Sequence, residues 1–315
     1  MKIAIVAPGG VGGYFGGLLA VAGEEVSALA RGAHLAAIKA GGLKIEGSRG
    51  NHVAKMEASD DAGSLGKADV VIFAVKLFQA EEAARAAAPL FGPQTLAVSL
   101  LNGIDGPEKL AGALPGVTVL GGSAYVSAVI AAPGLVRYTS AMSSIVFGAP
   151  PQGGDEGSEA ARAKAADFVA RCRKAGFSAE MVDDIQSALW KKFIGLAANA
   201  ALTSAARLPA GPLYSDADVV EVAAALIAEG TAVARAAGAQ VPADIETVSV
   251  QRLKEFPPGM YASMYHDIAK GGPLEVDGLS GYIVREGRRL GVPTPYHAAL
   301  YAVLKPHRAG TPRLA

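Results

Sequence analysis

The stretch MKIAIVAPGGVGGYFGGLLAVAGEEVSALAR, residues 1–31, decides the fold of this 315-residue chain. The apolar run 3–7 suits a buried strand, a glycine-rich turn follows at 7–13, and a helix-like segment then leads to a second strand at 25–30. A strand, a glycine turn, a helix and a strand within about 30 residues form the βαβ unit that binds dinucleotides.

The glycine turn departs from the usual fingerprint at one position. It reads Ala-x-Gly-x-x-Gly, with Ala7 where the first glycine usually stands, and alanine fits there if its φ is negative. Such a turn lets the backbone approach a pyrophosphate, and the N-terminus of the following helix offers N–H donors to it. The alternative is a tight turn that binds no ligand. The residues expected to bind the cofactor here are Ala7, Pro8, Gly9, Gly10, Val11 and Gly12.

The residue after the second strand distinguishes two cofactors. NAD sites usually carry Asp or Glu there, bonded to the ribose 2′-hydroxyl, whereas this chain has Arg31. An acidic side chain would repel the 2′-phosphate of NADP, and a guanidinium pairs with it in bidentate fashion. The sequence therefore predicts NADP(H), with a surface arginine that binds nothing as the alternative.

Composition and charge argue against several classes of protein. Lys plus Arg and Asp plus Glu each number 29, so no net field favours nucleic acid or an anionic membrane. No apolar run reaches the roughly 18 residues of a spanning helix, and the first apolar run is too short for a signal peptide. Cys172 is the single cysteine, which rules out an internal disulfide. We expect a cytoplasmic protein that binds neither nucleic acid nor membranes.

Strands and helices alternate beyond the first unit. Strand signals recur at 43–45 (as an edge strand), 69–75, 95–100, 114–132, 136–139, 144–148 and 177–182, helix signals at 33–41 and 160–175, and a polar loop at 149–159. This alternation predicts an α/β fold with a Rossmann-type doubly wound sheet. Ligands of such sheets lie beyond the C-terminal ends of the strands, where Lys76 and Asn102 stand.

From Asp184 onward the pattern is helical for nearly the whole remainder. We therefore expect an NADP(H)-binding Rossmann domain over 1–182 and an all-helical substrate and catalytic domain over 183–315. The apolar segment 219–233 fits either a dimer interface or a core helix, so a monomer and a homodimer both remain open.

Several short motifs, spread over nearly the whole chain, are specific in combination. They are the turn at 7–12, Ala30-Arg31-Gly32, Val75-Lys76-x-x-Gln79, Leu101-Asn102-Gly103, Leu189-Trp190-Lys191-Lys192-Phe193, Ser263-Met264-x-x-Asp267 and Glu275. Together they resemble the ketopantoate reductases (2-dehydropantoate 2-reductases). The resemblance implies NADPH-dependent reduction of a 2-oxo acid to a D-2-hydroxy acid, in a cleft between a Rossmann domain and a helical domain.

The resemblance also assigns the catalytic residues. Hydride arriving at a ketone carbon leaves negative charge on the carbonyl oxygen, which must be stabilised and protonated. By resemblance Lys192 donates that proton, and the apolar stretch 193–202 behind it would desolvate the lysine and lower its pKa. Glu275, which the sequence places in the first turn of a helix, by resemblance bonds the substrate hydroxyl, partners the lysine and contacts the cofactor. Without the resemblance, a solvated Lys-Lys pair and helix-dipole stabilisation by Glu275 are the alternatives.

Three further residues receive roles in the same way. By resemblance Ser263 binds the substrate carboxylate or hydroxyls, Asn102 touches nicotinamide or substrate, and Lys76 contacts cofactor and substrate. The structural alternatives are a helix-surface serine, an asparagine that opens a turn, and a solvated lysine at a strand end.

One departure from the family bears on the substrate. Well-known members carry asparagines four and eight residues after the catalytic lysine, where this chain has Leu196 and Ala200. Asn199 lies nearly in line with Lys192 on a helix, and we hypothesise that it supplies part of the missing polar contact to substrate. The alternative for Asn199 is a buried helix–helix contact. A more apolar wall would suit a bulkier, more apolar 2-oxo acid.

Three functions follow in order of preference. The first is NADPH-dependent reduction of 2-dehydropantoate to (R)-pantoate, in pantothenate biosynthesis. The second is a D-2-hydroxy acid dehydrogenase of mandelate type, and the third is an NADP(H)-binding sensor without turnover. No histidine pair has metal-ligand spacing with a carboxylate or cysteine, so we expect no metal site.

Overall fold

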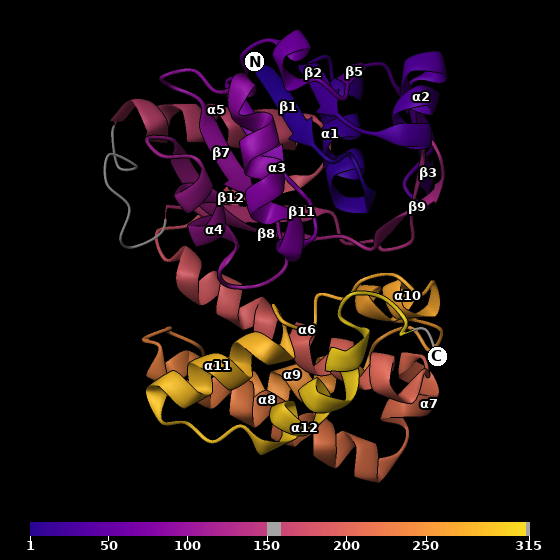
Figure 1. The fold of residues 1–315 in the computed structure, drawn as a ribbon, viewed down its shortest axis with the longest axis vertical. Coiled ribbons are helices and arrows are strands. Elements are labelled where there is room, and N and C mark those ends of the chain that lie inside the picture. The colour runs from indigo at the N-terminus through magenta and orange to yellow at the C-terminus, as the bar shows by residue number, and fades with distance from the viewer. Residues whose placement is uncertain (150–158, 313–315) are drawn as a thin grey trace. The chain divides into compact units, whose positions relative to one another are not determined.

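The computed structural model of the protein describes residues 1–149 and 159–312 (Figure 1). They form two compact units, Met1–Ala188 and Leu189–Ala315. The predicted boundary after residue 182 lies just before helix α6 (Ile185–Ala206), whereas the two units divide within that helix. The polar loop expected at 149–159 falls almost wholly outside the described residues. The roles expected of the two domains remain predictions.

The N-terminal unit is built on an eight-stranded mixed sheet. In spatial order its strands are β12 (Ser178–Met181), β11 (Ser144–Gly148), β8 (Thr118–Tyr125), β7 (Leu96–Ser99), β6 (Val70–Phe73), β1 (Lys2–Val6), β2 (Glu25–Leu29) and β5 (Glu57–Ser59). Neighbouring strands run parallel, except that β8 and β11 are antiparallel. Strands β1, β6 and β7, which match the apolar runs at 3–7, 69–75 and 95–100, therefore lie side by side.

Helices cover both faces of this sheet. They are α1 (Gly10–Val21), α2 (Gly32–Gly41), α3 (Ala80–Ala87), α4 (Gly106–Ala113) and α5 (Glu159–Lys174), with short 3-10 turns η1 (Ala62–Leu65), η2 (Leu77–Gln79) and η3 (Ala88–Leu90). Ile3 and Ile5 of β1 are buried with side chains of α1, α2 and α5, whereas Ala4 and Val6 are buried with side chains of α3 and α4. The expected α/β fold with a doubly wound sheet is confirmed.

A second, four-stranded sheet was not expected from the sequence. Its order is β4 (His52–Ala54), β3 (Leu43–Gly47), β10 (Leu135–Tyr138) and β9 (Ala128–Ala132). The prediction that 43–45 is an edge strand is wrong, because β3 pairs with β4 on one side and with β10 on the other. The pairing of β3 with β10 joins segments far apart in the chain, which local periodicity does not reveal.

Helix α1 packs against both sheets, and its glycines make room for this. A Cβ on Gly12 or Gly16 would press against Ile5 of the eight-stranded sheet, whereas one on Gly17 would press against Ile45 of the four-stranded sheet. Residues four apart lie on the same side of a helix, so paired glycines free two sides at once. The glycine-rich sequence of α1 is therefore required by packing.

The regular elements in the described residues of the C-terminal unit are helices, which confirms the expected helical region. Beside the rest of α6 it contains α7 (Ala210–Tyr214), α8 (Ala217–Ala236), α9 (Ile245–Lys254), α10 (Ser263–Ala269), α11 (Ser280–Leu290), α12 (Pro295–Leu304) and η5 (Lys305–His307). Helices α9, α11 and α12 pack on α8, which buries Leu226 and Ile227 inside the unit. In the described part of the chain, no helix is long and apolar enough to cross a membrane.

A buried polar network ties α8, α11 and α12 together. The Glu229 carboxylate accepts the backbone N–H groups of Tyr296 and His297, at 2.7 and 2.9 Å, at the start of α12. The His297 ring lies 3.1 Å from the Leu226 carbonyl oxygen and 3.2 Å from the Ser280 hydroxyl. Because a carbonyl only accepts, Nε2 carries a proton. Burial lowers the pKa of the ring and disfavours a second proton, so Nδ1 accepts from Ser280. The fold therefore selects a neutral His297.

This network makes the protein sensitive to acid. Burial lowers the pKa of His297 from 6.5 to about 4. Between these values the unfolded chain binds the proton and the folded chain does not, so stability is present above pH 6.5 and is lost as pH falls toward 4. The gap corresponds to about 3 kcal/mol of unfolding free energy.

We predict that urea unfolding at a series of pH values between 7 and about 4.5 shows this loss, and that it is smaller in a His297→Gln variant. The control is His266→Gln, which removes an exposed histidine and should keep the wild-type slope. Equal slopes in wild type and His297→Gln would contradict the assignment.

Candidate functional site

The turn between β1 and α1 is strained at the position where the fingerprint departs from glycine. Ala7 has φ +61°, so the expectation of a negative φ is wrong. The conformation is held by hydrogen bonds from Ala7 N to Leu29 O at 3.0 Å and from Gly9 N to Ala7 O at 2.7 Å. A left-handed conformation costs an L-residue roughly 1–2 kcal/mol. The turn therefore keeps a glycine-like geometry although it lacks the glycine.

The next glycines are explained by contacts within the protein. A Cβ on Gly10 would overlap the Ala128 carbonyl of β9, and one on Gly12 would lie 2.8 Å from Ala7 O and 3.0 Å from Ala74 Cβ. Gly9 is the N-cap of α1, where no side chain caps the helix and no acidic residue stands in the first turn. The first N–H groups of α1 are thus available to an anion without competition from a capping side chain.

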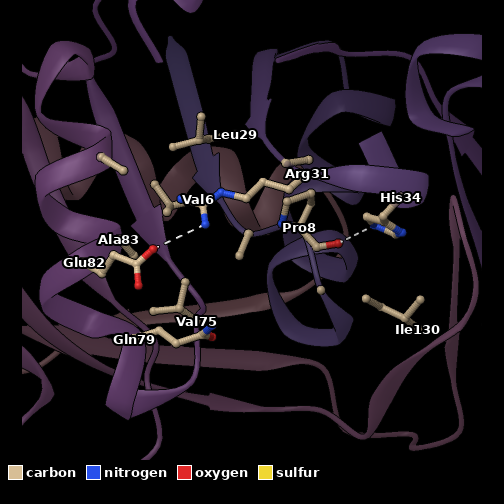
Figure 2. Close-up of a pocket in the computed structure, with 14 residues that line it drawn as sticks. Val6, Pro8, Leu29, Arg31, His34, Val75, Gln79, Glu82, Ala83 and Ile130 are labelled. Atoms are coloured by element: carbon tan, nitrogen blue, oxygen red, sulfur yellow. Dashed lines mark hydrogen bonds and ion pairs between the residues drawn. The ribbon is translucent and has the colours of Figure 1, made fainter. Parts of the chain in front are cut away.

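A pocket of about 230 Å³ lies beside this turn (Figure 2). Its walls come from the ends of β1 and β2, from α3 with the turn before it, and from Ile130 of β9. The residues that line it are Val6, Ala7, Pro8, Gly9, Leu29, Ala30, Arg31, His34, Val75, Gln79, Glu82, Ala83, Ala86 and Ile130. It thus brings together Ala7, Pro8, Gly9 and Arg31 of the predicted cofactor residues. Gly10, Val11 and Gly12 continue into α1 and are not part of this lining.

Arg31 and His34, two polar residues of the lining, make hydrogen bonds to neighbouring residues. Arg31 Nη1 lies 3.4 Å from Glu82 Oε1 of α3. His34 Nε2 lies 2.9 Å from Pro8 O (Figure 2). The backbone N–H of Gly134 donates to His34 Nδ1, with 3.0 Å between the two nitrogens. Since Nδ1 accepts from that N–H, Nε2 carries the proton and donates to Pro8 O, and His34 thereby supports the turn.

Sequence reasoning missed His34 and Glu82 as pocket residues. Glu82 lies in the first turn of a helix, where acidic side chains are common for dipole reasons alone, so nothing in the sequence pointed it at Arg31. His34 lies three residues beyond Arg31 on α2, and only the turn back toward Pro8 reveals its contact.

Lys76 and Asn102 follow adjacent strands of the sheet. Lys76 is the N-cap of η2 after β6, and Asn102 lies in the turn after β7, next to Gly103 with φ +115°. Both are half-buried. Because β7, β6 and β1 are parallel neighbours, both residues stand at the same edge of the sheet as the glycine turn. Their roles toward cofactor and substrate stay predictions.

The C-terminal unit contains the predicted lysine and carboxylate. Lys192 is a half-buried residue of α6 between the buried Trp190 and Phe193. Burial lowers the pKa of Lys192 to about 8, and the negative charge of Glu275 opposes this by raising it. Glu275 itself is 4% exposed. The two groups therefore interact electrostatically within one unit.

The expected place of Glu275 in the first turn of a helix is wrong. Helix α11 begins at Ser280, and Glu275 lies before it in a turn whose N–H groups, from Gly278 and Leu279, both bond to Glu275 O at 3.0 Å. These two bonds, one spanning three residues and the other four, close a turn at Glu275 that ends before the regular helix starts. The side chain is therefore positioned by a turn.

The remaining predicted residues have distinct settings. Ser263 is the exposed first residue of α10. Asn199 is buried on α6, and its Oδ1 accepts a hydrogen bond from the Tyr214 hydroxyl of α7 at 2.7 Å. This is a helix–helix contact, so one end of the Asn199 amide is engaged within the fold. Ala200 is also buried, and Leu196 is half-buried.

A metal site and a nucleophilic cysteine are two further possibilities, and the described residues support neither. Across 1–149 and 159–312, no group of three or more His, Cys, Asp or Glu side chains is placed to hold a metal ion. Cys172 is fully buried on α5, and burial raises the pKa of its thiol. A protonated, inaccessible thiol is a poor nucleophile.

The chain matches two family models, described as "Ketopantoate reductase PanE/ApbA" over residues 3–152 and "Ketopantoate reductase PanE/ApbA C terminal" over residues 184–308. An uncharacterized oxidoreductase, YkpB, of Bacillus subtilis is 31% identical, over 98% of this chain and 99% of its own. A 2-dehydropantoate 2-reductase of Mesorhizobium japonicum is 30% identical, over 97% of each chain.

Solved structures give the same result. A PanE/ApbA family ketopantoate reductase from Ralstonia eutropha is 34% identical, with a TM-score of 0.87 over 98% of both chains. A ternary structure of D-mandelate dehydrogenase with NADH and anilino(oxo)acetate also has a TM-score of 0.87 over 98% of both chains. At 23% identity, that second likeness concerns the fold alone.

We predict that Ala7→Gly stabilises the protein by about 0.5–1 kcal/mol, because relief of the left-handed strain exceeds the extra entropy of glycine in the unfolded chain. Urea unfolding measures the change. The control is Ala22→Gly at the end of α1, where φ is −75° and glycine brings no relief. A loss of stability in Ala7→Gly as large as that in Ala22→Gly would show that Ala7 is not strained.

Proposed function

The chain belongs to the ketopantoate reductase PanE/ApbA family, and we propose on that basis that it reduces 2-dehydropantoate to (R)-pantoate with NADPH. Members of this family are oxidoreductases that act on CH–OH groups, and a pyridine nucleotide is their cofactor. The observation that carries the finer proposal is the lysine of lowered pKa that interacts with a buried carboxylate, Lys192 with Glu275.

The N-terminal unit has the features that a dinucleotide requires. The first turn of α1 has no side-chain cap, and Arg31 lines the pocket beside that turn. These features fit a pyrophosphate at the turn and an adenosine 2′-phosphate at Arg31. We propose NADP(H) as the cofactor, held by Ala7, Pro8, Gly9, Gly10, Val11, Gly12, Arg31, Lys76, Asn102 and Glu275. When bound, it supplies the hydride.

The residues of the C-terminal unit supply the proton. At neutral pH an ammonium with a pKa of about 8 is still protonated, yet it releases its proton more readily than an ordinary lysine. In our proposal Lys192 Nζ protonates the substrate carbonyl oxygen as negative charge develops there, and Glu275 keeps the lysine charged between turnovers. Ser263 and Asn102 bind the 2-oxo acid, and Lys76 contacts both cofactor and substrate.

A second substrate class is favoured by one observation. The positions one and two turns beyond Lys192 on α6 are apolar, with Leu196 half-buried and Ala200 buried. Such a wall offers a hydroxylated substrate fewer hydrogen bonds and an aromatic one more apolar contact. A D-2-hydroxy acid dehydrogenase of mandelate type is therefore the alternative. A sensor without turnover is less well supported, because such a protein needs no proton donor and would leave the pairing of Lys192 with Glu275 unexplained. We propose a cytoplasmic monomer or homodimer.

The test is a panel of 2-oxo acids with NADPH and with NADH, in which loss of reduced-nicotinamide absorbance measures turnover. The proposal expects 2-dehydropantoate and NADPH to give the highest kcat/KM. Turnover of bulky aromatic 2-oxo acids but not of 2-dehydropantoate would select the alternative, and turnover of none would favour the sensor.

We predict that kcat/KM for reduction falls about tenfold per pH unit above pH 8, as Lys192 loses its proton. Because the charge of Glu275 raises the pKa of Lys192, Glu275→Gln should move this fall to lower pH. Lys192→Met should lose roughly 10²–10⁴-fold in kcat. The exposed neighbour gives the control, since Lys191→Met should retain both rate and pH profile. An unchanged profile in Glu275→Gln would refute the pairing.

The hypothesis that Asn199 contacts substrate predicts a loss of about tenfold in kcat/KM for Asn199→Ala, the size expected for one hydrogen bond to a charged group. The same substitution also breaks the bond to Tyr214. Tyr214→Phe removes that bond alone and is the matched control. If both variants lose stability but keep kcat/KM, Asn199 has only a structural role.

A further inference from the structure

The pocket beside the glycine turn carries two opposite charges that face each other. Arg31 follows β2, and Glu82 comes from α3, which follows β6; strand β1 lies between β2 and β6 in the sheet. The guanidinium Nη1 and the carboxylate Oε1 are 3.4 Å apart, and Figure 2 shows the two side chains pointing toward each other. Both residues line the pocket.

The ion pair is weak enough to open. Each of the two side chains is 70% exposed. An exposed pair of this kind contributes little stability, because water and salt screen it. Arg31 can therefore leave Glu82 for a phosphate without a large loss. Glu82 nevertheless stays anchored on α3 at the same pocket wall, so its charge remains close to whatever Arg31 binds.

The charge balance of the pocket differs from that of a site built for a phosphate alone. Among its described lining residues, Arg31 and Glu82 are the formally charged ones, and they cancel. His34, also in the lining, has both ring nitrogens engaged, one by the Gly134 N–H and the other by Pro8 O. Arg31 attracts an adenosine 2′-phosphate, whereas Glu82 repels it over a distance of a few ångströms.

The same carboxylate can serve the other cofactor. In NAD sites an acidic residue accepts a hydrogen bond from the ribose 2′-hydroxyl, and it usually follows the second strand. Here that position is Arg31, and the acidic side chain reaches the pocket from α3 instead. Glu82 is thus placed to accept a 2′-hydroxyl on the side of the pocket opposite Arg31.

We propose that Glu82 is a specificity-determining residue that reduces the preference of the protein for NADPH over NADH. It competes with the 2′-phosphate for Arg31, repels that phosphate, and accepts the 2′-hydroxyl of NADH. The inference rests on the proposed function, because it assumes that this pocket holds the adenosine half of the cofactor.

The experiment uses isothermal titration calorimetry with adenosine 2′,5′-bisphosphate and 5′-AMP, which probe the adenosine half without any turnover. In Glu82→Gln, affinity for the bisphosphate should rise roughly 3- to 10-fold at low ionic strength, and the gain should shrink in about 0.5 M salt. Affinity for 5′-AMP should stay the same or fall. The NADPH to NADH ratio of kcat/KM in the intact enzyme should rise by a similar factor.

Glu81→Gln is the matched control. Glu81 is the preceding residue of the same first turn of α3, it pairs with Arg85 at 3.8 Å, and it does not line the pocket. The Glu81→Gln substitution removes one negative charge from the same helix, so a purely global charge effect would appear in both variants. An equal change in both, or no change of the bisphosphate to AMP ratio in Glu82→Gln, would overturn the inference.

The outcomes separate this inference from the proposed function. If the wild-type protein binds both nucleotides, and the ratio of its affinities for the bisphosphate and AMP is the same in Glu82→Gln, only the inference is refuted. If the wild-type protein binds neither nucleotide, both the proposed cofactor site and the inference are refuted. A fall of bisphosphate affinity in Glu82→Gln would mean that Glu82 instead orients Arg31 for the phosphate, which also overturns the proposal.

Discussion

The N-terminal unit depends on the close approach of one helix to two sheets. Helix α1 can lie this near to both because the positions that face them have no Cβ, with Gly16 toward Ile5 and Gly17 toward Ile45. At Gly10 the neighbour is a backbone carbonyl of β9, which no side chain can displace cheaply. The turn expected to receive a pyrophosphate is therefore also the place where the second sheet is attached to the first.

The C-terminal unit handles buried ionisable groups in two opposite ways. Burial keeps His297 uncharged, and both ring nitrogens have hydrogen-bond partners, so the ring is a polar part of the core. Lys192 is desolvated too, but the charge of Glu275 limits the loss of its proton. The first arrangement stabilises helix packing, and the second leaves a cation near its titration point at neutral pH. Only the second is suited to moving protons.

Much of the fold followed from local sequence patterns. The apolar runs of β1, β6 and β7 and the glycine turn are long or distinctive enough to show a doubly wound sheet. The second sheet did not follow, because β4 has three residues and β3 pairs with a strand about 90 residues away. The φ of Ala7 was not predictable from its residue type, because backbone hydrogen bonds impose a positive φ that an alanine side chain disfavours. Glu82 and His34 were missed because their partners lie on other elements.

The packing of α1 separates two properties that are often treated as one. Gly10, Gly12, Gly16 and Gly17 cannot gain a side chain without pressing on one sheet or the other, even in a chain that binds nothing at the turn. Arg31 and Glu82, by contrast, project from the surface and support no core contact, so substitution there leaves the scaffold intact. The glycines are thus fixed by the packing of the scaffold, whereas the two exposed charges can be replaced without disturbing it.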